Sequence, residues 1–243
     1  MSELLEIKHL TKRFGDSSVL EDINITVKKG EVVVILGPSG CGKSTLLRCI
    51  NALEDIQGGE ILIDGEDIGK SADMSKVGMV FQSYDLFPHL SVIDNITLAP
   101  RKVQKRAKAE AEEEARELLK RVGLSGKEKS FPRELSGGQK QRVAIVRALM
   151  MHPELLLFDE VTAALDPEMV REVLEVILGL AKQGRTMMIV THEMQFAKAI
   201  ADRVIMIDGG TIVEEAPPER FFTAPATERA RKFLETFTYE SVR

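Results

Sequence analysis

The residues with the clearest chemistry are nine consecutive positions whose spacing reads G-x-x-x-x-G-K-S-T. Glycines in such a stretch let successive backbone N–H groups converge on phosphate oxygens, which a Cβ atom would obstruct. Lys43 supplies a mobile positive charge to the outer phosphates, and the Ser44 hydroxyl is placed to hold Mg²⁺. A glycine-rich turn that merely begins a helix is the alternative. The spacing predicts that the chain binds a nucleoside triphosphate through Gly37, Pro38, Ser39, Gly40, Cys41, Gly42, Lys43, Ser44 and Thr45.

A pair of carboxylates follows the apolar run Leu155–Phe158. Asp159 stands where hydrolases with a phosphate-binding loop place the carboxylate that orders Mg²⁺. Consecutive residues near a strand end project differently, so Glu160 can face a water molecule instead. A buried carboxylate pair is unfavourable without partners, which favours a functional role over packing. We therefore predict that Asp159 is a metal ligand. Glu160 is the expected general base that aligns a water for in-line attack on the γ-phosphate.

His192 ends another apolar strand, residues 186–190, and is predicted to reach the same sheet edge as Asp159 and Lys43. At that edge it could hydrogen-bond the γ-phosphate or hold the water in line. The other three histidines receive a structural interpretation: His9, His89 and His152.

A second glycine-rich helix start reads Leu135-Ser136-Gly137-Gly138-Gln139. A hydroxyl and backbone N–H groups at a helix start favour an anion. A simple helix cap by Ser136 is the competing interpretation and, on chemistry alone, the preferred one. Five specified positions recur by chance in only about one window in a few million, however, so the stretch calls for an explanation of its own.

The elements that position these residues follow from the apolar patterns. Alternating runs at 5–10, 19–27 and 61–63 predict a mostly antiparallel β layer, with an Asp64-Gly65 turn. Short apolar runs predict further strands at 31–36, 77–81, 155–158 and 186–190, and a hairpin at 204–213. Helical spacing predicts helices after Lys43 and Ser136, and over 101–122 and 168–180. The expected buried face of the helix at 101–122 consists of Ala107, Ala111, Ala115, Leu118, Leu119 and Val122.

Two aromatic groups complete this expectation. Phe14 is expected between the first two strands, either as a core residue or as a flat ring on which adenine stacks. Near the C-terminus, five residues are expected to pack back on the core: Phe221, Phe222, Phe233, Leu234 and Phe237.

Composition narrows the class of protein. The 243 residues carry a net charge of -5, which argues against a general nucleic-acid-binding surface, and no nucleic-acid partner is expected. No apolar run approaches the ~20 residues that cross a bilayer, and the N-terminus lacks the features of a signal peptide. Cys41 and Cys49 are too few for a metal cage, and reduced thiols suit the cytoplasm.

Taken in order, these motifs resemble the ATP-binding cassette family over nearly the whole chain. The shared motifs are the phosphate-binding loop, Gln82, Leu135–Gln139, Asp159-Glu160, Ala164-Leu165-Asp166 and His192. The resemblance implies an α/β fold: a P-loop nucleotide hydrolase core with an antiparallel β layer and an inserted helical subdomain. A single domain of residues 1–243 is expected, with the core at 1–87 and 151–220, the helical subdomain at 88–150 and a helical tail at 221–243.

The resemblance also implies roles that the spacing does not show. Two copies would pair head to tail and sandwich each ATP between the phosphate-binding loop of one and Ser136, Gly137, Gly138 and Gln139 of the other. Phe14 would stack on adenine, Gln82 would touch Mg²⁺ and the attacking water, and Asp166 would lie at the dimer contact. The expected cofactors are ATP and Mg²⁺.

Within the family, the chain looks like the polar amino acid uptake group. The segments that carry this likeness are residues 81–89, 95–100, 191–194 and 228–234. The group implies docking on an integral membrane permease at the cytoplasmic face of the membrane, and indirect cooperation with a solute-binding protein. Two residues depart from the family pattern: Val161 replaces a proline and Ala163 a serine. The alternatives are a non-transport cassette acting on DNA or ribosomes, a cassette ATPase for another small solute, and a small-molecule kinase.

Overall fold

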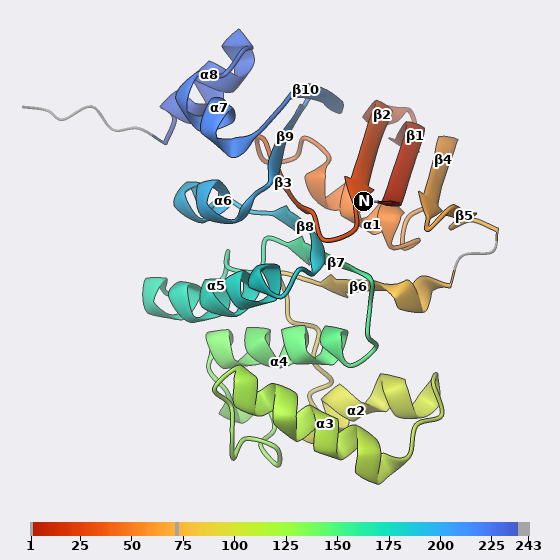
Figure 1. Ribbon diagram of the computed structural model, residues 1–243, viewed down its shortest axis with the longest axis vertical. Helices are drawn as coiled ribbons and strands as arrows, with labels where there is room; N and C mark the ends of the chain where they lie inside the picture. The colour runs from red at the N-terminus through yellow and green to blue at the C-terminus, as the bar shows by residue number, and fades with distance from the viewer. Residues whose placement is uncertain (1, 71–72, 238–243) are drawn as a thin grey trace, which may run out of the picture. The chain divides into compact units, whose positions relative to one another are not determined.

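Chain contacts divide the protein into two units, one made of residues 1–74 with 184–243 and the other of residues 75–183. The computed structural model describes residues 2–70 and 73–237 (Figure 1). The last six positions of the tail expected at 221–243 lie outside this range. Among the described residues, no helix has both the length and the apolar character needed to cross a membrane.

The first unit contains an antiparallel sheet with the strand order β2-β1-β4-β5. Its strands are β1 (Glu3–Phe14), β2 (Ser17–Lys28), β4 (Gly58–Ile63) and β5 (Glu66–Asp67). The alternating apolar residues of β2 are buried and their neighbours are exposed, which confirms the predicted β layer. Asp64 and Gly65, both with positive φ, join β4 to β5 as expected. Strand β1 is longer than predicted, so Phe14 ends the strand instead of lying in a connection.

The same unit contains strands in the order β10-β9-β3-β8. They are β3 (Val32–Leu36), β8 (Thr186–Val190), β9 (Arg203–Asp208) and β10 (Thr211–Ala216). Strand β3 runs parallel to both β8 and β9, while β10 returns antiparallel to β9. Every residue of β3 and β8 is buried, which explains their continuous apolar sequences.

The described residues of this unit form the helices α1 (Lys43–Ile50), α6 (Met194–Ile200), α7 (Pro218–Thr223) and α8 (Glu228–Glu235). Helix α1 packs near β8, and α7 and α8 pack against β10 (Figure 1). Phe221 and Phe233 are buried as predicted, and Phe222 and Leu234 are half-buried. The prediction for Phe237 is wrong: the residue is 41% exposed beyond the end of α8, although its ring lies against that of Phe233.

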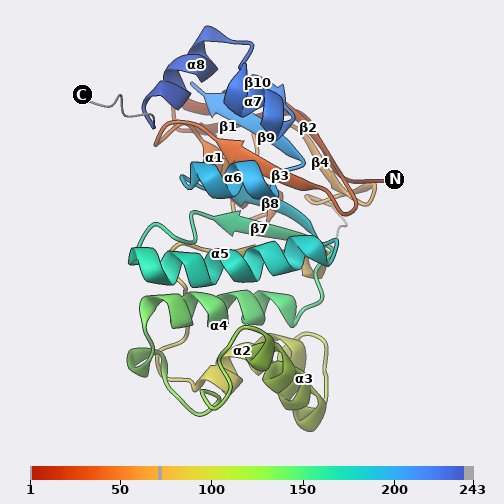
Figure 2. The same ribbon diagram turned by 60° about the vertical axis from the view of Figure 1, so that its left-hand side comes forward.

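The second unit combines two parallel strands with four helices. A 3-10 turn at Met74–Lys76 leads into strand β6 (Val77–Val80). Strand β6 pairs in parallel with β7 (Leu155–Asp159). The helices are α2 (Val92–Lys102), α3 (Lys108–Arg121), α4 (Gly137–Leu149) and α5 (Pro167–Lys182), with a 3-10 turn at Pro132–Glu134. Figure 2 shows α4 lying between α5 and the pair formed by α2 and α3. Their shared core includes Val92, Ile96, Ala111, Ala115, Leu119, Leu135, Val143 and Val146.

The single helix predicted at 101–122 is wrong, because two helices cover this region. Lys105 has a φ of 59°, which an α-helix does not tolerate. Ala107 occupies the exposed position just before α3 instead of lying on the buried face of that helix. Leu118 is only half-buried, while the remaining four predicted face residues are buried: Ala111, Ala115, Leu119 and Val122. The start of α2 was also missed, although Ser91, whose hydroxyl accepts from the Asp94 N–H, is a recognisable helix cap.

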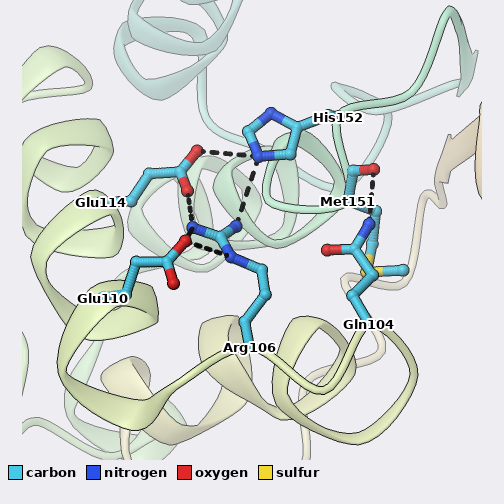
Figure 3. A network of polar contacts seen from close by, with 6 residues as sticks. All are labelled: Gln104, Arg106, Glu110, Glu114, Met151 and His152. Carbon is cyan, nitrogen blue, oxygen red and sulfur yellow. Dashed lines mark hydrogen bonds and ion pairs between the residues drawn. The ribbon is translucent and has the colours of Figure 1, made fainter.

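A polar network fixes the break between α2 and α3 (Figure 3). Arg106 donates to Glu110 and Glu114, and the ring of His152 contacts both Arg106 and Glu114 at 3.3 Å. Gln104 donates to the carbonyl of Met151. Two of these partners, Met151 and His152, lie more than forty residues further along the chain, which explains why helical periodicity alone did not reveal the break. The structural interpretation of His152 agrees with this network.

Candidate nucleotide site

Strand β3 leads directly into the predicted phosphate-binding loop, and α1 begins at its end. At Gly37 (φ 147°) an added Cβ atom would lie 2.0 Å from the carbonyl oxygen of Ile207. At Gly42 (φ 104°), the cap of α1, it would lie 2.7 Å from a methyl group of Leu20. Backbone conformation and close packing therefore both require glycine at these two positions. The resulting helix start offers N–H groups and a dipole to an anion.

Lys43 lies against this loop and is only 4% exposed. Its ammonium group donates to the carbonyl oxygens of Gly37 at 2.9 Å and of Pro38 at 2.8 Å. Ser44 and Thr45 follow half-buried in the first turn of α1. The loop thus holds a cation beside the N–H groups of a helix start, the pair of features that binds phosphate oxygens.

The two cysteines are buried. Burial raises the pKa of the Cys41 thiol in the loop, and it raises the pKa of Cys49 on α1 to about 11. Both side chains therefore remain protonated at neutral pH and contribute packing instead of nucleophilic chemistry.

Phe14 is 48% exposed at the end of β1, so it is not a core aromatic. The ammonium group of Lys12 lies 4.4 Å from the ring centroid. An exposed ring of this kind can stack on a flat heterocycle.

His192 lies at the same edge of its sheet as the phosphate-binding loop. Val190 pairs with Ile35, so β3 and β8 end side by side, and the chain reaches Gly37 and His192 two residues beyond that pair. Thr191 is buried and its hydroxyl accepts the N–H of Glu193, whereas His192 is exposed. The first unit therefore gathers the loop and His192 at one edge, as predicted.

In the second unit, Gln82, Asp159 and Glu160 lie at the carboxyl ends of β6 and β7. Val80 pairs with Phe158, and two residues beyond that pair the chain reaches Gln82 and Glu160. Asp159 ends β7 and is buried, while Glu160 is half-buried and Gln82 is exposed. Glu160 has a left-handed backbone (φ 46°), so the chain turns sharply after Asp159. The two adjacent carboxylates therefore occupy different environments, as the strand-end argument predicts.

The second glycine-rich stretch begins α4, and Ser136 caps that helix. Its hydroxyl accepts the N–H of Gln139 at 3.3 Å, and the Gln139 side chain accepts the N–H of Ser136 at 3.2 Å. This reciprocal capping box confirms the simpler interpretation. The glycines are also needed for packing, because a Cβ atom at Gly137 or Gly138 would come within 3.0 Å of Leu165 or Met169. The anion-binding role of the stretch stays a prediction.

Asp166 is exposed at the position before α5, and its side chain makes no capping bond. Of the two departures from the family pattern, Val161 is buried and Ala163 is exposed. The branched side chain of Val161 therefore fills core volume after Glu160.

Two polar residues of α4 were missed by the sequence reasoning. The amide of Gln141, which is fully buried, donates to the carbonyl of Phe81 at 3.1 Å. The guanidinium of Arg147 donates to the carbonyls of Tyr84 and Asp85. Both side chains tie the segment after Gln82 to the helix that begins at Ser136. Polar residues on the buried face of a predicted helix were the signal that could have revealed them.

Comparisons with known proteins agree with this geometry. A model of the ABC transporter family matches residues 20–163. The glutamate/aspartate import ATP-binding protein GltL of Escherichia coli K12 is 55% identical over 236 residues, which cover 95% of this chain and 98% of that protein. The arginine transport ATP-binding protein ArtM of Bacillus subtilis 168 is 52% identical over 237 residues, or 96% and 99% of the two chains.

A solved structure is also similar. It is a dimeric post-hydrolysis state of the ATP-binding cassette MJ0796 bound to ADP and Pi. It aligns with a TM-score of 0.78 and 33% identity over 88% of this chain and 99% of that chain. The fold class and the family indicated by the motifs are thereby confirmed. The chain belongs to the ABC transporter family and is an ATP-binding ATPase of that family.

Proposed function

We propose that this ATPase dimerises on ATP and powers the import of a polar amino acid through a membrane permease. The observation that carries the proposal is identity above one half, over nearly full length, to subunits named for amino acid import and transport. One of these is named for acidic amino acids and the other for arginine, at nearly equal identity. A subunit so similar to both does not select its substrate by charge, so we assign selection to the permease and the solute-binding protein.

The chemistry we propose begins at the phosphate-binding loop. Lys43 exchanges the carbonyls of Gly37 and Pro38 for the outer phosphates of ATP, and adenine stacks on the exposed ring of Phe14. We assign Mg²⁺ binding to Ser44, Gln82 and Asp159, because hydroxyl, amide and carboxylate oxygens are the donors that this ion takes. Bound there, the ion would neutralise charge on the β- and γ-phosphates.

Glu160 is the proposed general base and His192 the proposed γ-phosphate contact. Glu160 accepts a proton from the attacking water, which Gln82 helps to orient. His192, exposed after β8, donates to the γ-phosphate oxygens as charge builds up there.

The second copy of the chain completes each pocket in this proposal. The Ser136 hydroxyl accepts a bond from Gln139, so its own proton is available for a phosphate oxygen of the partner's ATP. Gly137, Gly138 and Gln139 add the helix start, and the exposed Asp166 lies at the dimer contact. The dimeric ADP-bound cassette among the similar structures supports this arrangement.

The permease contact is assigned to the segment after Gln82 and to the helical subdomain at 88–150. Phe87 in that segment is exposed, and Arg147 anchors the segment to α4. An exposed aromatic on an anchored loop suits a groove between membrane helices on the cytoplasmic face. The nucleotide-binding core is assigned to 1–87 and 151–220, and the tail to 221–243.

The substitution Glu160→Gln tests the catalytic assignment. The amide keeps the size of the side chain but accepts no proton, so hydrolysis should fall by about 10²-fold or more. ATP should still bind, and the variant should accumulate as a dimer in size-exclusion chromatography with ATP. Near-normal turnover would remove Glu160 from this role.

Uptake by cells tests the proposed transport. Cells lacking the chain should lose uptake of one polar amino acid, and the wild-type gene but not Glu160→Gln should restore it. Turnover that responds to DNA or ribosomes and not to a permease would contradict the proposal.

A further inference from the structure

Lys12 is a buried cation at the end of β1, next to the ring proposed to bind adenine. Its side chain is 5% exposed, whereas the side chain of Lys8 on the same strand is 45% exposed. Its ammonium group donates to the carbonyl of Asp55 at 2.7 Å and lies 3.0 Å from the carboxylate of Glu54. An ammonium group leaves water only where partners compensate for lost hydration. The fold therefore holds this charge in one place.

That place is one face of the Phe14 ring. The ammonium nitrogen lies 4.4 Å from the ring centroid, within the range of a cation–π contact. Phe14 as a residue nevertheless remains 48% exposed. Lys12 therefore covers one face of the ring and leaves surface for a second flat group. A cation on one face also draws π electrons toward itself, which makes the opposite face more attractive to an electron-rich heterocycle.

The partners of Lys12 connect the ring to the phosphate-binding helix. Glu54 and Asp55 lie in the segment that follows α1, the helix that begins at the phosphate-binding loop. Two further bonds join the same segment to β1: Gln57 N–H to the carbonyl of Thr11, and Arg13 N–H to the side chain of Gln57. The end of β1 and the end of α1 are thus held together, which fixes the ring relative to α1.

We propose that Lys12 is the positioning residue for the nucleobase: its ammonium group fixes and polarises the Phe14 ring, so that the ring's free face binds the adenine of ATP. The inference rests on the proposed role of Phe14 in the ATP site. The inference separates recognition of the adenine base from recognition of the phosphates, because Lys12 contacts the Phe14 ring whereas Lys43 is assigned to the triphosphate.

Binding measurements with two ligands test this role. ATP and inorganic tripolyphosphate, each with Mg²⁺, are titrated into the full chain by calorimetry. Lys12→Met keeps the stem of the side chain without its charge and should weaken ATP binding roughly 3- to 30-fold, the size of a cation–π contact. Binding of tripolyphosphate should not change. Lys12→Gln keeps an N–H donor for the carbonyl of Asp55 and should show the same loss of ATP affinity. It replaces Lys12→Met in the test if that variant folds poorly.

A double-mutant cycle separates Lys12 from a general effect on the fold. In a Phe14→Leu background, Lys12→Met should weaken ATP binding no further, because the ring through which it acts is gone. In steady-state assays, Lys12→Met should raise KM and leave kcat unchanged. The control is Lys8→Met, which removes a lysine of the same strand whose ion pairs are with Glu6 and Glu60. This substitution should change the affinity for neither ATP nor tripolyphosphate.

Three results would overturn the inference. Unchanged ATP binding in Lys12→Met, while Phe14→Leu loses affinity, removes the role of Lys12 and leaves the proposed function intact. An equal loss of tripolyphosphate binding shows that Lys12 merely supports the fold. Unchanged ATP binding in Phe14→Leu overturns the adenine site itself, and the Lys12 inference with it.

Discussion

Glu160 combines a proposed catalytic carboxylate with an unfavourable backbone. Its φ of 46° lies in the left-handed region, where a residue with a Cβ atom is disfavoured by about 1–2 kcal/mol relative to the usual conformations. The sharp turn after Asp159 requires that conformation, and glycine would satisfy it without strain. The chain carries a glutamate there, which is the pattern expected where function has priority over stability.

The strain at Glu160 predicts opposite effects for two small residues. Glu160→Gly and Glu160→Ala both remove the carboxylate, but only glycine relieves the backbone, so Glu160→Gly should be more stable by about 1 kcal/mol. Urea denaturation of the two variants measures the difference, and both should lack ATP hydrolysis. At Glu175, in the middle of α5, the same pair should show the reverse order, because glycine disfavours a helix. Equal stability of the two Glu160 variants would show that the turn stores no strain.

The sequence predicts single residues where a motif specifies them. It does not reveal residues whose burial depends on partners distant in sequence. The glycines of the phosphate-binding loop follow from their spacing, and the structure gives the physical reason at Gly37 and Gly42. Lys12 did not stand out, because its burial depends on Glu54 and Asp55 some forty positions further along the chain.

At the scale of elements, Glu214 connects β10 to the start of α8. Its side chain is 6% exposed and accepts three bonds, from the N–H groups of Ala226 and Thr227 and from the Thr227 hydroxyl. Burial alone would raise the pKa of Glu214, but these bonds and the charge of Arg220 hold that pKa below its ordinary value of 4.5. The charged form therefore stabilises the docked C-terminal segment. This contribution is fully present above the unfolded-state pKa and is lost as pH falls through the lower, folded-state pKa.

The substitution Glu214→Gln should reveal this contribution. An amide replaces two acceptor oxygens with one, so the variant should lose about 2 kcal/mol of unfolding free energy at neutral pH. The difference from wild type should shrink as pH falls through the folded-state pKa, because protonation removes the same charge from the wild type. Urea denaturation across that range measures it. Glu215→Gln, which alters the neighbouring carboxylate of a partly exposed pair with Arg203, should cost less than about 1 kcal/mol. A pH-independent difference for Glu214→Gln would contradict the assignment.

Elements with one continuous pattern were predicted closely, and elements ended by tertiary contacts were not. The apolar runs of β3 and β8 mark fully buried strands whatever surrounds them. The helix predicted at 101–122 instead breaks at Lys105, where Arg106 binds Glu110, Glu114 and His152. Glu110 and Glu114 belong to the segment itself, but His152 lies on another part of the chain, and no periodicity of the segment encodes that contact.

At the scale of the whole molecule, the capping box at Ser136 matters for how the dimer is tested. Because Ser136 caps α4 within its own copy, its replacement by alanine would weaken the helix as well as any phosphate contact. Aspartate caps helices as well as serine does, yet its charge repels phosphate. Ser136→Asp therefore separates the two roles that one sequence motif combines.

Mixing two inactive variants tests the shared pocket. Lys43→Ala lacks the phosphate contact, and Ser136→Asp repels the partner's ATP, so each alone should be inactive. A mixed dimer contains one pocket with both defects and one with neither, because Lys43 and Ser136 of a given pocket come from different copies. With random pairing, about half of the dimers are mixed, so hydrolysis should return to about a quarter of the wild-type rate. The matched control mixes Lys43→Ala with Glu160→Gln. Lys43 and Glu160 of a given pocket come from the same copy, so each pocket of a mixed dimer keeps one defect and ATP hydrolysis should not return. If both mixtures stay inactive, each chain must complete its own site, and Leu135–Gln139 would then act only as the start of α4.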